Sequence, residues 1–127
     1  MNAPISSLMS SLVWTVDMDD TIAKVERLLA ENGLSWAPVV EGGSKVVGVI
    51  SSSDLLHFHA LQRDPAAVRA WELCSYKPLI FDEATPVTEV ARAMVEQRLH
   101  HVVVTRRAGL AGVVSSLDFV KTFVGKL

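Results

Sequence analysis

Two short segments of this 127-residue chain carry the side chains best suited to bind a ligand. The first runs from Gly48 to Asp54 as Gly-Val-Ile-Ser-Ser-Ser-Asp, and the second runs from Gly112 to Asp118 as Gly-Val-Val-Ser-Ser-Leu-Asp. The second aspartate follows the first by 64 residues, about half the chain. Each segment predicts an apolar strand that turns through Ser-x-x-Asp into an apolar helix. The chain is therefore interpreted as two copies of one unit built around this turn, here called corner one and corner two.

A Ser-x-x-Asp corner has two chemical interpretations. In the first it is only a helix cap, in which the serine oxygen accepts from a free helix N–H and the acid stabilises the positive helix end. In the second, the free N–H groups attract an anion such as phosphate, and the aspartate accepts the hydroxyls of a ribose. Both interpretations stay open, because the same Gly-apolar-apolar strand precedes both copies.

The four histidines do not follow a metal-ligand pattern. His57 and His59 are two residues apart on a predicted helix and point apart, whereas His100 and His101 are adjacent on a predicted strand and face opposite sides. No cysteine or paired carboxylate completes a ligand set, so no metal site is expected. His100 and His101 are interpreted as ordinary strand residues or, for one of them, as a phosphate contact.

The sequence contains no pattern typical of a catalytic site. No Gly-x-Ser-x-Gly elbow is present, the cap accounts for Ser51 and Asp54, and no acid/base pair stands out. We therefore expect no catalytic residues and no enzyme activity. Trp14, Trp36 and Trp71 are interpreted as core or interface residues, with stacking on a ligand as the alternative, chiefly for Trp36.

Composition excludes several further classes of function. The net charge is −2, which argues against nucleic-acid binding, and the apolar runs are too short for a transmembrane helix. No basic segment followed by a long apolar core begins the chain, so no signal peptide is expected. Cys74 is the single cysteine, which favours a reduced, cytoplasmic setting and a role as a small apolar filler. Half the residues are hydrophobic, which leaves apolar surface for contacts between subunits.

The elements that position the corners are expected in the same order in both halves. The first half predicts, in order, an apolar turn at 5–9, a strand at 12–16, a helix from about residue 22 to a glycine at 33, strands at 38–40 and 45–50, and a helix from corner one to about residue 63. A connecting helix at 66–73 follows. The second half repeats the pattern at an offset of 65 residues, with a strand at 78–81, and at an offset of 64 after its shorter hairpin turn.

Each copy therefore reads as strand, helix, strand, strand, helix. A three-stranded sheet with two helices on one face leaves an apolar face in water, and two such units packed together bury it. The predicted fold class is α/β (α+β), with two half-modules, residues 1–64 and 65–127, packed as an intramolecular pair. These ranges are called the first and the second repeat.

The pattern resembles a tandem pair of CBS domains, the Bateman module named after cystathionine β-synthase, over nearly the whole chain. The resemblance rests on Pro38-Val39-Val40, His100-His101-Val102-Val103-Val104 and the two corners with their strands. The second repeat departs from the family pattern, because Val103 replaces the usual proline and the hairpin is one residue short.

The resemblance implies regulation rather than catalysis. Such a stand-alone CBS-domain protein is expected to bind an adenosine-containing ligand, AMP, ADP, ATP or S-adenosylmethionine, with no required cofactor. It is also expected to form a homodimer and to signal to a regulated partner on another chain. The alternative is a dimerisation or protein-interaction module whose sites are empty or degenerate, with both corners serving only as caps.

The resemblance further implies two ligand sites, each shared between the repeats. Site one joins corner-one residues with the start of the second repeat's first and second strands: Ser51, Ser53, Asp54, Pro78, Leu79, Ile80, His100, His101 and Val102. Site two joins corner-two residues with the matching part of the first repeat: Ser115, Ser116, Asp118, Val13, Trp14, Thr15, Ser35 and Trp36. The aspartates are expected to hold ribose, the serines to hold phosphate or ribose, and the apolar residues to wall the adenine. Site one is expected to be the better site, because the strand start in site two lacks a cation.

Overall fold

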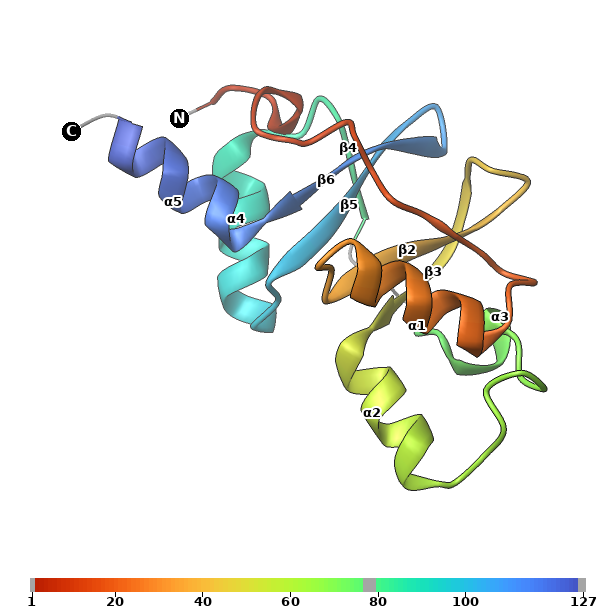
Figure 1. Ribbon diagram of the computed structural model, residues 1–127. Helices are drawn as coiled ribbons and strands as arrows, with labels where there is room; N and C mark the ends of the chain where they lie inside the picture. The colour runs from red at the N-terminus through yellow and green to blue at the C-terminus, as the bar shows by residue number, and fades with distance from the viewer. Residues whose placement is uncertain (1, 77–79, 126–127) are drawn as a thin grey trace. The chain divides into compact units, whose positions relative to one another are not determined.

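The computed structural model describes residues 2–76 and 80–125, which form two compact units (Figure 1). The first unit spans Trp14–Pro78, and the second unit combines Met1–Val13 with Leu79–Leu127. The predicted halves 1–64 and 65–127 remain a division of the sequence. The contacts group the chain differently, because a segment of each half packs with the other half's sheet.

The first unit has a three-stranded sheet in the order β1-β2-β3. Its first strand runs parallel to β2, and β2 and β3 form an antiparallel hairpin. Its elements are β1 (Val16–Asp17), α1 (Ile22–Glu31), β2 (Trp36–Glu41), β3 (Lys45–Ser51), α2 (Ser52–Ala60) and α3 (Ala70–Leu73).

The second unit repeats this plan with the strand order β4-β5-β6 and the same parallel and antiparallel pairings. Its elements are a 3₁₀ helix η1 (Ile5–Ser7), β4 (Ile80–Asp82), α4 (Val87–Gln97), β5 (His101–Arg106), β6 (Gly109–Ser115) and α5 (Ser116–Gly125). The predicted mixed α/β fold with two copies of one unit is confirmed.

Local sequence explains why α1 and α4 begin and end where they do. In α1 the Thr21 hydroxyl accepts from the Lys24 N–H at 3.2 Å, and the helix is followed by Gly33 at φ +62°. The apolar faces of the two helices are buried at matching positions: Ile22, Val25 and Leu29 in α1, and Val87, Val90 and Met94 in α4. Helix α4 ends at Gln97, and its C-cap residue Arg98 adopts the left-handed conformation of Gly33 without being a glycine.

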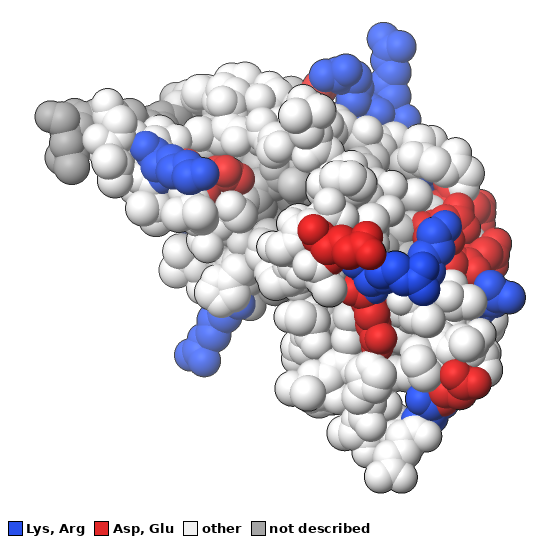
Figure 2. Space-filling view, in the orientation of Figure 1, with Lys and Arg blue, Asp and Glu red and all other residues white. Residues whose placement is uncertain are grey.

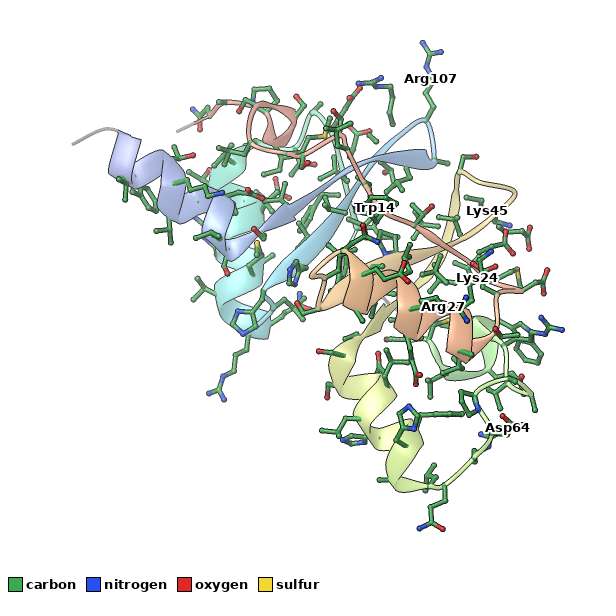
Figure 3. The ribbon with its side chains drawn as sticks, in the orientation of Figure 1. Trp14, Lys24, Arg27, Lys45, Asp64 and Arg107 are labelled. Atoms are coloured by element: carbon green, nitrogen blue, oxygen red, sulfur yellow. The ribbon has the colours of Figure 1, made fainter. Side chains whose placement is uncertain are left out.

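The two hairpin turns differ as the shorter second turn predicts. The β2–β3 turn contains Gly42 and Gly43 at positive φ, whereas the β5–β6 turn places Arg107 and Ala108 there, at φ +51° and +66°. Positive φ at both central residues suits a tight turn between twisted strands. Arg107 projects away from the sheet at the tip of this hairpin (Figure 3).

Each unit has its own core, made mainly of branched aliphatic side chains. The core of the first unit includes Val16, Ile22, Val25, Ala37, Val39, Ile50, Phe58, Ala70 and Cys74. The core of the second unit includes Ile5, Val87, Val90, Met94, Val102, Val104, Val114 and Phe119. Cys74 therefore occupies the predicted place of a small apolar filler.

The segment that precedes the first strand of each repeat pairs with the third strand of the other repeat. Val49 and Ser75 exchange two backbone hydrogen bonds of 3.0 and 2.9 Å, and Ser10 and Val113 exchange two of 2.9 and 3.0 Å. These isolated antiparallel bridges add residues near Ser75 to the edge at β3 and residues near Ser10 to the edge at β6. This pairing explains why Ile5 is buried in the second unit and Ala70 in the first.

The predicted strand at 12–16 is wrong for most of its length, because only Val16–Asp17 pairs with β2. Leu12 is 91 % exposed and Trp14 is 54 % exposed, so the apolar side chains that favoured a strand lie on the surface. The matching strand at 78–81 is Ile80–Asp82 within the described part of the chain. Pro78 and Leu79 lie outside the described residues.

The predicted connecting helix at 66–73 is also wrong over its first part. Only Ala70–Leu73 is helical, because the Val68 carbonyl accepts from the Ile22 N–H at 2.8 Å and Arg69 forms a bridge with Thr21. The Asp64 carboxylate accepts from the Ala66 N–H at 2.9 Å and makes a turn rather than a helix start. The helix after corner one ends at Ala60, three residues before the predicted end.

Candidate functional site

Corner one is a complete capping box at the start of α2. Ser51 is extended, at φ −125° and ψ 164°, and its hydroxyl oxygen accepts from the Asp54 N–H at 3.3 Å. In return, Asp54 Oδ2 accepts from the Ser51 N–H at 2.8 Å and from the Ser51 hydroxyl at 3.0 Å. The reciprocal bonds fix both side chains on the turn, as the Ser-x-x-Asp spacing requires.

Corner two has the same geometry at the start of α5. The Ser115 hydroxyl accepts from the Asp118 N–H at 3.3 Å, and Asp118 Oδ2 accepts from the Ser115 N–H at 2.7 Å and from its hydroxyl at 3.1 Å. In both corners only one carboxylate oxygen is used in the cap. Within the described residues, Oδ1 of Asp54 and Oδ1 of Asp118 make no hydrogen bond, so each carboxylate keeps one acceptor that the cap does not use.

Each corner is held by the start of the second strand of its own repeat. The Ser52 N–H donates to the Ser35 carbonyl at 2.9 Å, and the Ser116 N–H donates to the His100 carbonyl at 2.9 Å. On the sheet, Trp36 is the register partner of Ser51. His101 likewise is the register partner of Ser115. Ser35 and Trp36 therefore lie beside corner one, and His100 and His101 lie beside corner two.

The residues predicted for site one fall in both units. Ser51, Ser53 and Asp54 belong to the first unit, and Ile80, His100, His101 and Val102 belong to the second; Pro78 and Leu79 lie outside the described residues. Ile80 is 42 % exposed at the start of β4, whereas the Val102 side chain is fully buried in the core of the second unit. The joining of these residues into one site stays a prediction.

The residues predicted for site two are divided in the same way. Ser115, Ser116 and Asp118 belong to the second unit together with Val13, and Trp14, Thr15, Ser35 and Trp36 belong to the first unit. Trp14 is 54 % exposed and Trp71 is 44 % exposed, so neither is a core residue. The shared site two also stays a prediction.

His101 lies half-buried at the start of β5, where its surroundings favour the neutral ring. Burial lowers the pKa of His101 below its ordinary value of 6.5, and the neighbouring His100 lowers it further. Asp118 acts in the opposite direction and raises it. A neutral imidazole has one N–H donor and one acceptor nitrogen, so at pH 7 His101 suits hydrogen bonding better than charge pairing.

A pocket of about 290 Å³ in the first unit contains cations that the sequence patterns did not single out. Thr15 lines it together with the α1 side chains of Lys24, Arg27 and Glu31. Lys24 and Arg27 project from α1 (Figure 3), and Lys24 Nζ lies 3.0 Å from Asp20 Oδ1. On a helix that shows basic and acidic side chains side by side (Figure 2), their spacing looks like an ordinary solvated face.

Neither a metal centre nor a membrane span is found in the part of the chain that the structure describes. No group of three or more His, Cys, Asp or Glu side chains in residues 2–76 and 80–125 is placed to hold a metal ion. Over the same ranges, none of the helices combines the length and the apolar character needed to cross a membrane. Burial raises the pKa of the Cys74 thiol, which opposes formation of a reactive thiolate.

Comparison with known proteins shows the family and the fold. Residues 5–60 and 70–125 match the family model described as CBS domain. The structure is similar to that of the CBS domain pair of protein MJ0100 in complex with 5′-methylthioadenosine and S-adenosyl-L-methionine, with a TM-score of 0.85, 23 % identity and coverage of 100 % of both chains. It is also similar to CBSX2 in complex with AMP, with a TM-score of 0.85, 21 % identity and coverage of 98 % of both chains.

A curated relative is similar in sequence over the same region. An uncharacterized protein of Methanocaldococcus jannaschii is 27 % identical over 127 residues, which is 99 % of this chain. The chain spans 46 % of the length of that relative. The match covers both corners and therefore extends over the whole repeated pattern.

Proposed function

The chain belongs to the CBS-domain family, and we propose that it is a regulatory module that binds an adenosine-containing nucleotide. The ligand class is AMP, ADP, ATP or S-adenosylmethionine, and the binding event is passed to a partner protein. Similar domain pairs have been solved with 5′-methylthioadenosine and S-adenosyl-L-methionine and with AMP, which supports this class. No catalytic residue is assigned.

The observation that carries the proposal is that the two oxygens of each corner carboxylate differ, because one is used in the helix cap and the other is not. Oδ2 of Asp54 completes the cap, and Oδ1 makes no hydrogen bond within the described residues. Asp118 repeats this arrangement. A ribose presents two adjacent hydroxyl donors, and a carboxylate oxygen fixed at a helix start accepts from them without an entropic cost for ordering the side chain. In each first turn the N–H of Ser53 or of Leu117 has no hydrogen-bond partner among the described residues, and the positive end of the helix favours the phosphate there.

We assign site one and site two with the residues that the family resemblance implies. In site one, Asp54 holds the ribose, Ser51 and Ser53 contact ribose or phosphate, and His100 or His101 faces the phosphate. In site two, Asp118 holds the ribose, as Asp54 does in site one. Arg27 and Lys24, the latter paired with Asp20, line a pocket with the site-two residue Thr15. Basic side chains therefore also lie near this site-two residue, and we propose that both sites bind.

Regulation then follows from differential binding. A nucleotide held by residues of both repeats favours the arrangement of the repeats that closes the site, and it alters a partner only by the difference in its affinity for the two arrangements. We propose a homodimer as the working form and the cytoplasm as its location. The regulated partner is proposed to be a separate chain.

A second candidate function is an interaction module with empty sites. The completeness of both capping boxes favours it, because Ser51, Asp54, Ser115 and Asp118 then already have a structural role. In that case the apolar surface serves dimerisation alone. The two candidates differ in whether any adenosine ligand stabilises the chain.

Thermal denaturation of the full chain with AMP, ADP, ATP, S-adenosylmethionine and NAD tests the proposal. A ligand with a micromolar dissociation constant, present at about 1 mM, adds about 4 kcal/mol to the free energy of unfolding, which is a shift of many degrees in Tm. We expect a clear shift with at least one ligand. No shift with any of them would favour the interaction module.

Calorimetric titration of variants then tests the assigned sites. Asp54→Ala and Asp118→Ala are each expected to weaken binding about tenfold or more at the site that loses its ribose acceptor. Asp64→Ala is the matched control, because it removes the same charge from a turn of the first unit (Figure 3). If both corner variants bind as tightly as the control, the site assignment is wrong even where the nucleotide itself binds.

A further inference from the structure

Two tryptophans of the first unit lie at the same end of its sheet. Strand β1 runs parallel to β2, with Val16 opposite Val39, so the chain enters both strands from one end of the sheet. Trp14 lies two residues before β1 (Figure 3), and Trp36 is the first residue of β2. Both belong to the residues proposed for site two, where the family resemblance implies no more than an apolar wall.

Both indoles lie outside the core of the first unit. Trp14 is 54 % exposed, and Trp36 is half-buried. Trp36 precedes Ala37, whose side chain is fully buried in that core. Because successive side chains of a strand point to opposite faces, the indole of Trp36 lies on the face of β2 away from the core. Two large aromatic rings at one end of a sheet and outside its core are typical of a binding surface.

Site two contains an acid and no base among its proposed residues. Asp118 is the one charged residue in this set, and its Oδ1 is not used in the cap. Trp36 is in register with Ser51, and the turn that follows Ser51 adds a second carboxylate, Asp54, and no base. The proposed site therefore combines two indoles with carboxylates.

The pocket beside Thr15 does not change this balance of charge. Two bases line it, Lys24 and Arg27, and so do two acids, Asp20 and Glu31. Lys24 Nζ lies 3.0 Å from Asp20 Oδ1, so the charge of this base is already paired. The pocket and the proposed site together carry a net negative charge, which favours a cationic ligand over a phosphate.

The aromatic pair is specific to site two. At the positions of Trp14 and Trp36 the second repeat has Leu79 and His101, which are among the residues proposed for site one. One proposed site therefore has two indoles at these positions, and the other has none. This difference predicts that the two sites prefer different ligands.

We infer that site two selects S-adenosylmethionine, whose sulfonium lies against the indoles of Trp14 and Trp36. The sulfonium sulfur joins the adenosyl group to the methionine chain and carries a positive charge. A cation is attracted by the negative face of an aromatic ring, and tryptophan makes the strongest contact of this kind. The phosphate of AMP has the opposite charge and is disfavoured by the same rings and carboxylates. The inference rests on the proposed function, because Asp118 still holds the ribose.

Calorimetric titration of the full chain with S-adenosylmethionine, S-adenosylhomocysteine and AMP tests the inference. S-adenosylhomocysteine lacks only the sulfonium methyl group and the charge, so the comparison isolates the cation. We expect S-adenosylmethionine to bind site two about tenfold more tightly than either of the other two ligands. Binding at site two is recognised by its loss in Asp118→Ala.

The three tryptophans provide a matched set of variants. Trp14→Leu and Trp36→Leu are each expected to reduce the preference for S-adenosylmethionine over S-adenosylhomocysteine about threefold or more. This ratio separates a cation contact from a packing role, because lost packing weakens both ligands alike. Trp71→Leu changes a tryptophan of α3 that is 44 % exposed and belongs to neither site, and it is expected to leave both affinities unchanged.

Two further measurements keep the test independent of folding. Trp36→Phe keeps an aromatic face at the half-buried position and is expected to retain most of the preference. In the Trp71→Leu chain the remaining indole fluorescence comes from Trp14 and Trp36, so saturation with S-adenosylmethionine is expected to change it.

Equal binding of S-adenosylmethionine and S-adenosylhomocysteine at site two, or a preference that both leucine variants at positions 14 and 36 retain, would overturn the inference. The proposed function would stand in that case, since an adenosine ligand would still bind. Binding of no adenosine ligand would overturn both. A preference for S-adenosylmethionine that is lost in Asp54→Ala and kept in Asp118→Ala would assign it to site one and would equally contradict the inference.

Discussion

The backbone of Gly48 on β3 lies directly against that of Ser75, which belongs to the first part of the second repeat. A Cβ atom built on Gly48 would lie 2.3 Å from the Ser75 carbonyl oxygen and 3.0 Å from Cys74 Sγ. Gly112 on β6 meets Ser10 in the same way, with a Cβ position 2.6 Å from the Ser10 carbonyl oxygen. The glycine within each corner strand, Gly48 in β3 and Gly112 in β6, is therefore explained by the close approach of a segment from the other half.

Substitution of these glycines is expected to be strongly destabilising. Gly48→Ala and Gly112→Ala force backbone apart at a bridge that carries two hydrogen bonds, with an expected loss of about 1–3 kcal/mol each. Gly109→Ala is the control, because its Cβ has only an ordinary contact of 3.5 Å with the Arg106 carbonyl oxygen. Urea denaturation measures the three free energies of unfolding. Equal stability of Gly48→Ala and Gly109→Ala would contradict the close approach.

Ile5 tests the role of the N-terminal segment in the second unit. Its side chain is fully buried among residues of the second core, so Ile5→Ala is expected to cost about 2–5 kcal/mol of stability. Leu12→Ala, in the same segment, removes a side chain that is 91 % exposed and is expected to change stability by less than about 0.5 kcal/mol. Chemical denaturation of the two variants provides the comparison. If both are neutral, the segment does not pack in solution as it does here.

The capping boxes predict a stability effect that requires no ligand. Asp54→Ala removes the acceptor of the Ser51 N–H, and Asp118→Ala removes that of the Ser115 N–H, so each is expected to cost about 1 kcal/mol. This corresponds to a fall in Tm of about 4 °C. Ser53→Ala, one residue before Asp54 and outside the cap, serves as the reference. Thermal scans in nucleotide-free buffer measure the difference, and a fully stable Asp54→Ala chain would show that the cap contributes nothing.

His101 predicts a dependence of stability on pH. Its pKa in the folded chain lies below 6.5, so the unfolded chain binds the proton more readily than the folded one. The contribution of His101 is therefore fully present above pH 6.5 and is lost as the pH falls from 6.5 through the folded pKa. His101→Gln is expected to flatten this part of the stability profile. The imidazole resonances in an NMR titration, compared with the same chain in urea, give the two pKa values directly, and a folded value above the unfolded one would reverse the expected sign.

Sequence patterns predicted the repeated part of the fold well because it depends on local periodicity. The buried faces of α1 and α4, the hairpins and the corners follow from apolar spacing, glycines at positive φ and Ser-x-x-Asp. The patterns failed where tertiary hydrogen bonds decide. Val68 and Arg69 pair with residues 21–22 through backbone hydrogen bonds and a β-bridge, so they are not helical. Apolar residues near Leu12 lie on the surface rather than in a strand.

Of the candidate sites, only the geometry of the two corners was checked against the structure, and the joining of each corner with residues of the other repeat stays a prediction. The two capping boxes have the reciprocal bonds that their spacing predicts. The sequence patterns did not single out Arg27 in its pocket or Arg98 after α4. Arg27 looks like part of a solvated helix face, and Arg98 occupies a position where a glycine is expected. Such residues become noticeable only when the backbone angle and the neighbouring side chains are known.

The exchange of segments between the halves has a consequence for synthesis. Residues 2–13 are synthesised before the other described residues, but the sheet that they complete contains β6, which ends at Ser115. At translation rates of about 5–20 residues per second, several seconds therefore pass between the synthesis of Ile5 and the synthesis of the last strand of the core in which it is buried. The first unit needs residues only up to about Ser75 and has all its strands while the second half is still being made. The first unit is thus expected to fold before the second, with residues 2–13 among the last of the described residues to be buried.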